Sequence, residues 1–406
     1  MKPVLLLSNG HGEDLSGALL AAELMQRGIP VEALPLVGHG SPYRQRGVPV
    51  LGRTRSCSTG GLGYTSLRGR LSELLEGQMG HVLGQLLLLR RRRRHYGLVV
   101  AVGDVLAVLG SWLSGLPSAV YLVAYSSHYE GRLRLPWPCG WLLNQASIKA
   151  IWSRDSLTAN DLSQQLNRAV IFLGNPFLDV VSADPSQSLQ PLALQQLALV
   201  PGSRLPEAAH NFALMLRVLA LLPQAGARSQ PLRLRAALIS ELTSSCVAKL
   251  AAPLGWRLEA SDRLVRGRLA VELGWGQFGE ILASSQLVLC MAGTAAEQAV
   301  GLAKPVLQLV GKGPQFTASF AEAQRRLLGP GVHCAPGSSG SEATLAATAQ
   351  LAQELLEQQG DHKQGPALRQ SLAAIGLERI GAPGGSQAMA AAIMAMLRPN
   401  QAPELP

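Results

Sequence analysis

Short apolar runs alternate along this chain with longer stretches in which apolar residues recur at helical spacing. The runs "KPVLLL" and "GLVVAV" are continuous, as expected for strands that are buried on both faces of a parallel sheet. The stretches between such runs have the period of amphipathic helices. The alternation predicts parallel sheets covered by helices on both faces.

We expect strands at residues 3–7, 31–36, 98–102, 118–124, 149–152 and 170–173, and again at 196–200, 232–239, 256–259, 267–272, 286–290 and 305–309. We expect helices at residues 14–27, 66–89, 105–113, 155–166, 207–222, 241–252, 277–283, 294–302, 315–327, 343–358, 366–379 and 386–397.

A polar, proline-containing segment at 174–191 interrupts this pattern. We interpret it as the region linking two domains, because 406 residues are many for a single core. The predicted fold class is α/β, with two Rossmann-like, doubly wound parallel-sheet domains that face a cleft. The predicted boundaries are 1–180, a linker at 181–191, a second domain at 192–382, and a helix in 383–406 that crosses back to the first domain.

The net charge of +10 is distributed unevenly. Residues 1–180 hold 18 Lys and Arg against 11 Asp and Glu, whereas residues 181–406 hold 18 against 15. The first half is therefore the better candidate for contact with an anionic partner. Aromatic residues are only 4% of the chain, which argues against nucleic acid as that partner. The five cysteines have no metal-ligand spacing, so we expect no metal site and a cytoplasmic location.

The apolar segment 98–124 is long enough to suggest a membrane span. Gly103, Asp104 and the sequence "SGLP" interrupt it, however. We therefore interpret the segment as a strand, a helix and a second strand joined by turns.

The sequence "PGSRLPEAAHNF" follows an apolar run and opens a predicted helix. Gly202 and Ser203 would let backbone N–H groups approach an anion at the helix N-terminus. Arg204 can donate two parallel hydrogen bonds to a phosphate. We predict a phosphate-binding turn; the alternative is an ordinary strand-to-helix turn with an exposed arginine.

A second turn lies in "CMAGTAAEQAVGLAKPV", again between a predicted strand and helix. Gly293 and Thr294 can offer N–H and hydroxyl donors at the helix start, and Glu297 and Gln298 lie within the first helical turns. A carboxylate there can accept from ribose hydroxyls, as the acidic residue of dinucleotide folds does. The alternative is a capped helix whose glutamate is favoured near the positive end of the helix dipole. Together the two turns predict a nucleoside diphosphate site in the second domain.

The motifs "VAVGD", "GNP", "LVPGSRLPE" and "AGTAAEQAVGLAKPV" occur in this order along most of the chain. In order and spacing they resemble lipid-A-disaccharide synthase, a GT-B glycosyltransferase. The resemblance implies inverting transfer of an N-acetylglucosamine-type sugar from UDP to a lipid-linked sugar, by a peripheral enzyme at the cytoplasmic face of the membrane. It implies no metal and no cofactor beyond the UDP-sugar donor. The second domain would bind the UDP-sugar, and the first would receive the lipid-linked acceptor.

The resemblance also assigns roles to individual residues. The donor diphosphate would contact Gly202, Ser203 and Arg204, and the nucleotide turn would comprise Gly293, Thr294, Ala295 and Ala296. The family pattern "GTAALE" has its acid at the position of Gln298, whereas Glu297 precedes it, so either residue is a candidate for the ribose contact. Asn175, in "GNP", stands where the family often has histidine. Because the departures lie on the acceptor side, a lipid A precursor and another glycolipid are both open as acceptor.

The first loop, "SNGHGEDLSG", carries two adjacent acids between a predicted strand and helix. Two carboxylates would repel a pyrophosphate, and the glycines do not match the dinucleotide motif. The family has "GE-x-SGD" here, with its aspartate at the position of Asp14. We predict that Gly10, His11, Glu13 and Asp14 bind hydroxyls of the acceptor sugar. The alternative is that Asp14 caps the helix while Glu13 is exposed.

Asp104 is the candidate catalytic base, because it ends an apolar strand and inverting transfer needs a group that takes the proton of the attacking hydroxyl. Apolar neighbours would raise the pKa of this carboxyl and suit it to the task. The resemblance places the family's proposed base at the same residue. The alternative role is the N-cap of the helix that follows. His11 and His128 are weaker candidates for the base.

Two segments of the first domain suggest contact with an anionic membrane surface. "LLLLRRRRRH" joins an apolar stretch to five arginines, each of which would contribute about 1 kcal/mol near such a surface. "RLRLPWPCGWLL" sets two tryptophans beside arginines. The alternatives are a solvated helix end and a buried loop. The predicted contact residues are Arg90, Arg91, Arg92, Arg93, Arg94, Trp137 and Trp141.

Two other classes of function stay open. A sugar-nucleotide epimerase or hydrolase on the same fold would need further acid or base side chains around the donor sugar, which the sequence does not identify. A non-catalytic nucleotide-sugar-binding scaffold at the membrane would need no base at all.

Overall fold

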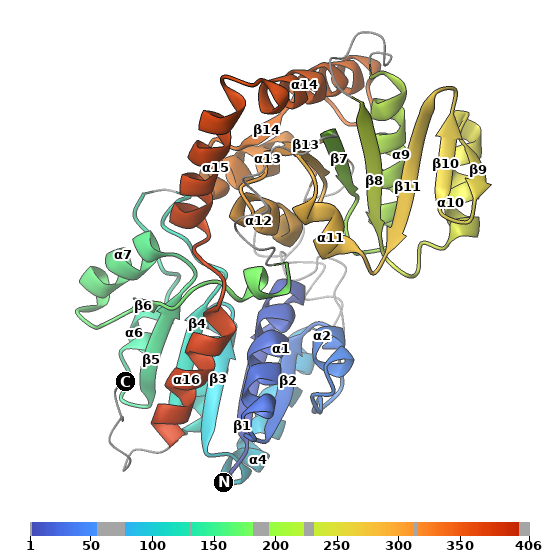
Figure 1. Ribbon diagram of the computed structural model, residues 1–406. Coiled ribbons are helices and arrows are strands. Elements are labelled where there is room, and N and C mark those ends of the chain that lie inside the picture. Colours follow the sequence, from blue (N-terminus) through green and yellow to red (C-terminus); the bar gives the residue numbers. More distant parts are fainter. Residues whose placement is uncertain are drawn as a thin grey trace. The chain divides into compact units, whose positions relative to one another are not determined.

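The computed structural model describes residues 2–54, 78–129, 131–181, 195–222, 231–311 and 316–397. The chain forms two compact units (Figure 1), of which unit 1 comprises residues 1–179 and 382–406 and unit 2 comprises residues 180–381. The chain thus leaves unit 1 once and returns to it once. The predicted linker beyond Val181 and residues 66–77 of a predicted helix lie outside the described residues.

Unit 1 is built on a six-stranded sheet with the order β2-β1-β3-β4-β5-β6, in which every pairing is parallel. Its strands are β1 (Val4–Asn9), β2 (Val31–Val37), β3 (Leu98–Val102), β4 (Ser118–Leu122), β5 (Ile148–Ser153) and β6 (Ile171–Phe172). Its helices are α1 (His11–Gln26), α2 (Ser41–Gln45), α4 (Gln78–Arg92), α5 (Val105–Ser114), α6 (Cys139–Leu143), α7 (Ser156–Leu166) and α16 (Gly385–Leu397), with 3-10 turns η2 (Arg93–His95) and η3 (Pro176–Val180).

The continuous apolar strands of unit 1 serve two cores, because successive side chains of a strand point to opposite faces. Val4 and Leu6 of β1 pack with α1 and α16 on one face of the sheet. Leu5 and Leu7 pack with α4 on the other face. This two-sided burial explains why the strand sequence shows no polar alternation.

Helix α16 belongs to the core of unit 1, although it follows all of unit 2 in the sequence. Met389, Ala390 and Ile393 are fully buried against α1 and the sheet. The carboxylate of Asp179, in η3, accepts hydrogen bonds from the backbone N–H groups of Gly384 (2.6 Å) and Ser386 (2.9 Å). Asp179 therefore supplies the acceptors that the start of α16 requires.

Unit 2 is built on an eight-stranded sheet with the order β14-β13-β12-β7-β8-β11-β10-β9. The central strands are parallel, and β9, β10 and β11 pair antiparallel. Its strands are β7 (Gln195–Val200), β8 (Leu232–Leu238), β9 (Arg257–Ala260), β10 (Arg263–Arg266), β11 (Leu269–Trp275), β12 (Leu287–Cys290), β13 (Val306–Gln308) and β14 (Val332–Cys334). Its helices are α9 (Glu207–Ala220), α10 (Ser244–Ala251), α11 (Phe278–Ala283), α12 (Gly293–Gly301), α13 (Ala318–Leu328), α14 (Glu342–Gly360) and α15 (Gly365–Arg379), with the 3-10 turn η5 (Ala252–Leu254).

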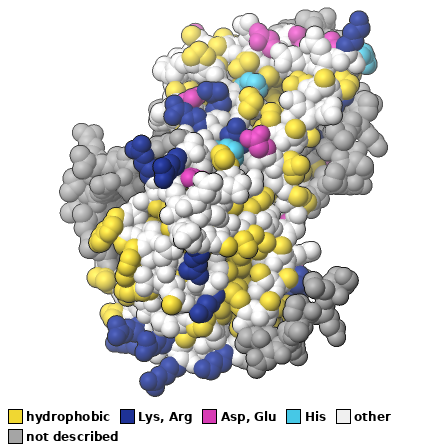
Figure 2. Space-filling view, turned by 90° about the vertical axis from the view of Figure 1, so that its left-hand side faces the viewer, with side chains coloured by type: hydrophobic (Ala, Val, Ile, Leu, Met, Phe, Trp, Pro, Cys, Tyr) yellow, Lys and Arg dark blue, Asp and Glu magenta, His cyan; other side chains and the backbone are white. Residues whose placement is uncertain are grey.

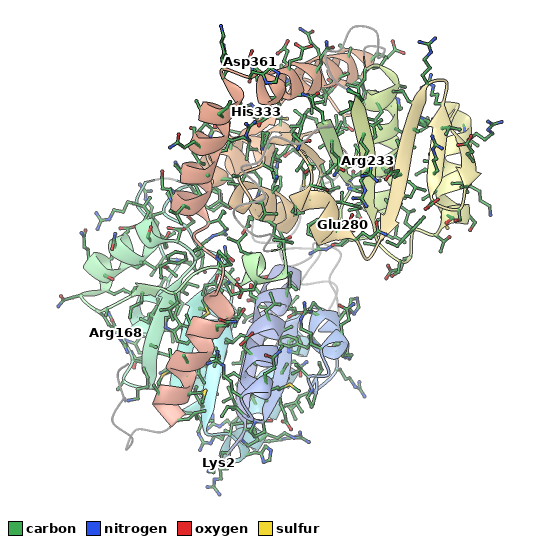
Figure 3. All side chains as sticks on the ribbon, viewed as in Figure 1. Lys2, Arg168, Arg233, Glu280, His333 and Asp361 are labelled. Carbon is green, nitrogen blue, oxygen red and sulfur yellow. The ribbon has the colours of Figure 1, made fainter. Side chains whose placement is uncertain are left out.

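One face of the unit 2 sheet packs with α9, α10 and α14 into an apolar core around Phe212 and Met215. On β8, arginines alternate with the apolar residues of that core. Arg233 pairs with Glu272 of β11 (2.6 Å), and Arg235 pairs with Glu280 of α11 (2.7 Å); Figure 3 labels Arg233 on β8 and Glu280 on α11. These charges are therefore neutralised within unit 2.

Most predicted elements are present, with ends that differ by a few residues. The apolar segment 98–124 forms β3, α5 and β4, as predicted. Among the described residues, no helix combines the length and apolar character needed to cross a bilayer. The structure adds α2, α6, β10 and β14, which the sequence analysis did not predict; each is only three to five residues long, too short for a periodic pattern.

Candidate functional site

The two predicted nucleotide turns of unit 2 lie at the same edge of its sheet. Their strands, β7 and β12, are parallel neighbours, and Val200 pairs with Cys290 at the carboxyl ends. The backbone N–H of Met291 donates to the carbonyl of Val200 at 2.9 Å. Doubly wound sheets bind their ligands outside these strand ends.

Gly202 allows the two turns to approach each other closely. Its φ of 109° lies in the region that favours glycine. A Cβ atom at this position would stand 3.2 Å from the carbonyl oxygen of Met291, in the other turn. The glycine is thus required by backbone conformation and by contact.

Both helices that follow the turns begin next to the predicted phosphate contacts. Ser203 and Arg204 are exposed, just before α9. The buried amide of Asn211 donates to the carbonyl of Pro201 (2.9 Å) and holds the turn from inside. Helix α12 begins at Gly293 behind Ala292, and no side chain caps it. The N–H groups of Gly293, Thr294 and Ala295 therefore remain free of a side-chain cap, as an anion site at a helix N-terminus requires.

Glu297 and Gln298 are both buried in the first turns of α12. Each already interacts with other groups of the chain. Which of them contacts a ribose therefore stays a prediction.

Asp104 lies at the carboxyl edge of the unit 1 sheet and is the N-cap of α5. Its Oδ1 atom accepts from the backbone N–H of Leu106 (2.8 Å) and from the side-chain amide of Asn9 (2.6 Å). The capping role that the sequence offered as an alternative is therefore real. It does not compete with a role as base, because the half-buried carboxylate remains at the sheet edge where ligands bind.

Burial is the largest influence on the Asp104 carboxyl and raises its pKa. The hydrogen bonds from Leu106, Asn9 and Ala107 act in the opposite direction and favour the charged form. The balance suits a general base, which must be ionised yet basic enough to take a proton.

The Glu13 side chain lies near Gly103, the residue before Asp104, at this edge. A Cβ atom on Gly103 would stand 3.3 Å from Cγ of Glu13, and one on Gly10 would stand 2.3 Å from its Oε2. The two glycines leave the space that the half-buried Glu13 side chain fills. Of the predicted acceptor-binding carboxylates, Glu13 is the one near the candidate base.

Asp14 is only 1% exposed and faces the interior of unit 1. Its oxygens accept from the hydroxyl of Ser8 (2.6 Å) and the backbone N–H of Gly40 (3.1 Å), and Tyr43 donates to Ser8 (3.1 Å). The alternative that Asp14 caps the helix is wrong, because α1 begins at His11 and Gly10 is its N-cap. This burial favours a structural role for Asp14, which ties the β2–α2 loop to β1.

Asn175 and His11 are the other two side chains predicted for the acceptor side, and the structure describes the side chain of Asn175 only. Asn175 is fully buried, directly before η3, and its Oδ1 accepts from the backbone N–H of Phe177 within η3 (3.0 Å). This position favours a structural role for Asn175. The backbone of His11 begins α1, and its side chain lies outside the described part of the chain.

The carboxyl ends of β4 and β5 add further titratable groups to this edge. Tyr125 accepts from the backbone N–H of Val105, next to Asp104, at 3.1 Å. The His128 imidazole lies 3.8 Å from the carboxylate of Asp155, and Ser126 donates to that carboxylate (2.7 Å). His128 and Asp155 are buried.

The predicted membrane-contact residues lie on or next to helices α4 and α6 of unit 1. Helix α5 packs against both α4 and α6, and Trp112 of α5 meets Trp141 of α6 edge to face, with ring centroids 5.3 Å apart. Trp137 is 92% exposed and Trp141 54% exposed. Both line a hollow of about 760 Å³ together with Arg132 and Arg134.

The neighbouring helix α4 ends in the arginine run and exposes Leu83 and Leu87. Figure 2 shows that apolar and Lys or Arg side chains lie side by side on a face of unit 1. The alternative of a buried loop at 132–143 is therefore wrong for the two tryptophans.

Asn9 and Tyr125 belong to the site, although neither is among the residues predicted from the sequence. Both contact the segment 104–105, from which they are 95 and 20 residues distant in sequence. The available signal for Asn9 was its place with Ser8 as the first polar residues after a continuous apolar run.

No protein-family model matches the sequence. No curated protein matches it. Solved structures, in contrast, match over nearly the whole chain.

MurG of Acinetobacter baumannii is 15% identical with a TM-score of 0.56, and the match covers 98% of this chain and 100% of that chain. The spinosyn rhamnosyltransferase SpnG is 17% identical with a TM-score of 0.55, covering 97% and 99%. The UDP-GlcNAc 2-epimerase of Neisseria meningitidis, solved with bound UDP-GlcNAc, is 14% identical with a TM-score of 0.50, covering 97% and 99%. At these identities the likeness establishes the fold. The predicted fold class, two doubly wound α/β domains of the GT-B type, is confirmed.

Proposed function

We propose that this protein is an inverting glycosyltransferase that moves a sugar, N-acetylglucosamine-type by the sequence resemblance, from a UDP-sugar to a lipid-linked sugar. The observation that carries the proposal is the pairing of the Gly202–Arg204 turn with the Gly293 turn at adjacent parallel strand ends of unit 2. Structural neighbours that include two transferases and an epimerase bound to a UDP-sugar support the same class of ligand.

On the donor side, the diphosphate would lie across the starts of α9 and α12. Arg204 and the N–H groups of Gly293 to Ala295 would stabilise the negative charge that grows on UDP as it departs. Glu297 or Gln298 would contact the ribose. No step in this scheme requires a metal ion.

On the acceptor side, Asp104 would take the proton from the attacking hydroxyl of the acceptor. The oxygen of that hydroxyl forms a bond to C1 of the donor sugar, and the bond from C1 to the UDP oxygen breaks with its electron pair on UDP. Glu13, whose side chain lies near Gly103, would orient a second acceptor hydroxyl.

The acceptor would reach unit 1 from an anionic membrane surface on the cytoplasmic side. The exposed Trp137 and Trp141, the hollow with Arg132 and Arg134, and the arginines at the end of α4 combine apolar and cationic groups. This is the composition that peripheral attachment to such a surface needs. A lipid A precursor and another glycolipid both satisfy it.

The proposal is tested in two steps. A melting-shift screen of UDP-, GDP- and dTDP-sugars should show stabilisation by one UDP-sugar, because a ligand that binds only the folded state raises its melting temperature. That donor, radiolabelled in the sugar, should then transfer label to extracted membrane lipids in the presence of the protein. Absence of any shift with UDP-sugars would contradict the proposal.

A sugar-nucleotide epimerase is the second candidate, and a specific observation favours it. The edge that carries Asp104 also holds Glu13 and the His128–Asp155 pair, and groups of these types would serve as the further acid and base that an epimerase requires. Exchange of the donor's sugar protons with deuterated water, without an acceptor, would identify this activity. Transfer to lipid without such exchange would exclude it.

A further inference from the structure

We infer that Asn9 is a positioning residue for Asp104, holding its carboxylate in one orientation at the edge of the unit 1 sheet. That Asn9 matters for catalysis rests on the proposed function. The hydrogen bond between Asn9 and Asp104 is observed within unit 1 and does not depend on that function.

The two residues face each other because of the strand register. Ser8 of β1 pairs with Val102 of β3, so Asn9, the last residue of β1, lies beside the Gly103–Asp104 segment that follows β3. The amide Nδ2 of Asn9 donates to Oδ1 of Asp104 at 2.6 Å, and the backbone N–H of Asp104 donates to Oδ1 of Asn9 at 3.4 Å. One amide group thus contacts both the side chain and the backbone of the same residue.

This reciprocal pair fixes the amide as well as the carboxylate. Rotating the Asn9 amide by half a turn would place its oxygen against a carboxylate oxygen and its NH₂ against an N–H group. Gly103, with a φ of 142°, makes room for the pair, because a Cβ atom there would stand 2.1 Å from Oδ1 of Asn9. The backbone is therefore shaped to admit Asn9 beside Asp104.

The N–H of Leu106 also donates to Oδ1 of Asp104, at 2.8 Å. Two donors from different elements, β1 and α5, hold the same oxygen. A carboxylate held in this way keeps a constant direction toward a reacting hydroxyl, and a displacement of about 1 Å in such a group can cost roughly 100-fold in rate.

Other titratable groups face this pair and belong to the test. Glu13 of α1 lies near Gly103, and Tyr125 of the β4 loop contacts Val105. Burial, and after it the charge of Asp104, raises the pKa of the Cys139 thiol of α6 to about 12. None of the three donates the 2.6 Å hydrogen bond that Asn9 supplies.

The test measures the pKa of Asp104 directly, by carbon NMR of aspartate labelled at the carboxyl carbon, with Asp104→Asn identifying the signal. Asn9→Leu keeps a similar shape but removes the donor, so the pKa should rise by about one unit. Asn9→Asp, which differs from wild type by a single group, should raise it further because two carboxylates share the site. The acid limb of kcat/KM against pH should move by the same amount, and kcat should fall about 10- to 100-fold with unchanged UDP affinity.

The matched control is Gln85→Leu. Gln85 is a buried amide of α4 that donates to the carbonyl of Arg53 at 2.6 Å. Its loss should lower the melting temperature without moving the Asp104 signal. An unchanged Asp104 pKa in both Asn9 variants would overturn the inference, whether or not turnover is found. Full turnover by Asp104→Asn would instead overturn the proposed function, and the NMR result would still decide whether Asn9 controls Asp104.

Discussion

The carbonyl oxygen of Met291 stands 3.2 Å from the place that a Cβ atom would occupy on Gly202. The turn after β7 and the turn after β12 are therefore in direct contact through backbone atoms. A donor that touches both turns would find them at a fixed separation before it binds.

Gly202→Ala should disturb this contact and weaken UDP binding. The left-handed φ alone makes the change unfavourable by about 1–3 kcal/mol, and the contact with Met291 adds to that cost. Thermal melts with and without UDP measure both effects. Gly267→Ala is the matched control, because Gly267 has a φ of 58° with no atom within 4 Å of the added Cβ. It should lower stability and leave UDP affinity unchanged; equal losses of affinity would contradict the prediction.

Arg204→Ala should reduce UDP affinity by at least tenfold, since a hydrogen bond to a charged group contributes about 1.5–3 kcal/mol. Because Arg204 is exposed, the fold should be unaffected. Isothermal titration with UDP gives the comparison. Arg268→Ala removes another exposed arginine, just before β11 at the opposite edge of the sheet, and should bind UDP like wild type.

Asp104→Asn should abolish most turnover while UDP still binds. Asparagine is as good an N-cap as aspartate, so α5 should keep its start. Loss of a general base typically costs about 100- to 10,000-fold in rate. Asp179→Asn is the control for an aspartate with a purely structural contact, at the start of α16. An unchanged rate in Asp104→Asn would remove this residue from its proposed role, whereas a scaffold would show no turnover in either protein.

Asp14 should make the stability of unit 1 depend on pH. Burial raises the pKa of Asp14 to about 7, against 3.8 as its ordinary value. Between these values the unfolded chain loses a proton that the folded chain keeps, so the contribution of Asp14 to stability is complete below pH 4 and is lost as pH rises to 7.

Asp14→Asn does not titrate. As pH rises from 4 to 7, the free energy of unfolding of wild type should therefore fall relative to that of Asp14→Asn, by about 1 kcal/mol per pH unit. Urea unfolding of both proteins at several pH values between 4 and 8 measures the difference. A difference that stays constant with pH would show that Asp14 is ionised in the folded state throughout.

Replacing Trp137 and Trp141 together by serine should weaken binding to vesicles that contain anionic lipid by about tenfold or more. Flotation with anionic and with neutral vesicles, at two salt concentrations, separates the apolar from the electrostatic part of the attraction. Leu377→Ser removes an apolar side chain that is 64% exposed in unit 2 and should bind vesicles normally. Equal binding by all three proteins would contradict membrane contact through the tryptophans.

Much of the fold was predictable because unit 1 buries its strands on both faces. Strands such as β1 and β3 are then continuous apolar runs, and these are easy to locate. Strands β10 and β14 have no such run, since β10 lies near the antiparallel end of its sheet and β14 is an edge strand of three residues. Short elements of this kind depend on their neighbours rather than on their own sequence.

The candidate site was predictable where its residues are contiguous. The turns at 202–204 and 293–295 could each be located in the sequence, because a glycine stands between an apolar run and the start of a predicted helix. The burial and the hydrogen bonds of the Asp14 side chain were not predictable, because Ser8 and Gly40 become its partners only when β1 and the β2–α2 loop meet. The same holds for Asn9, whose partner is 95 residues away.

Because Met389, Ala390 and Ile393 complete the core that Val4 and Leu6 begin, the order of synthesis matters. The ribosome synthesises residues 1–179 before all of unit 2, and α16 comes last. The apolar surface of unit 1 that α16 covers therefore stays exposed to solvent while unit 2 is translated. Unit 2 is free to fold in that interval. A fragment cut after Asp179 would therefore be expected to aggregate unless α16 were supplied as a separate peptide.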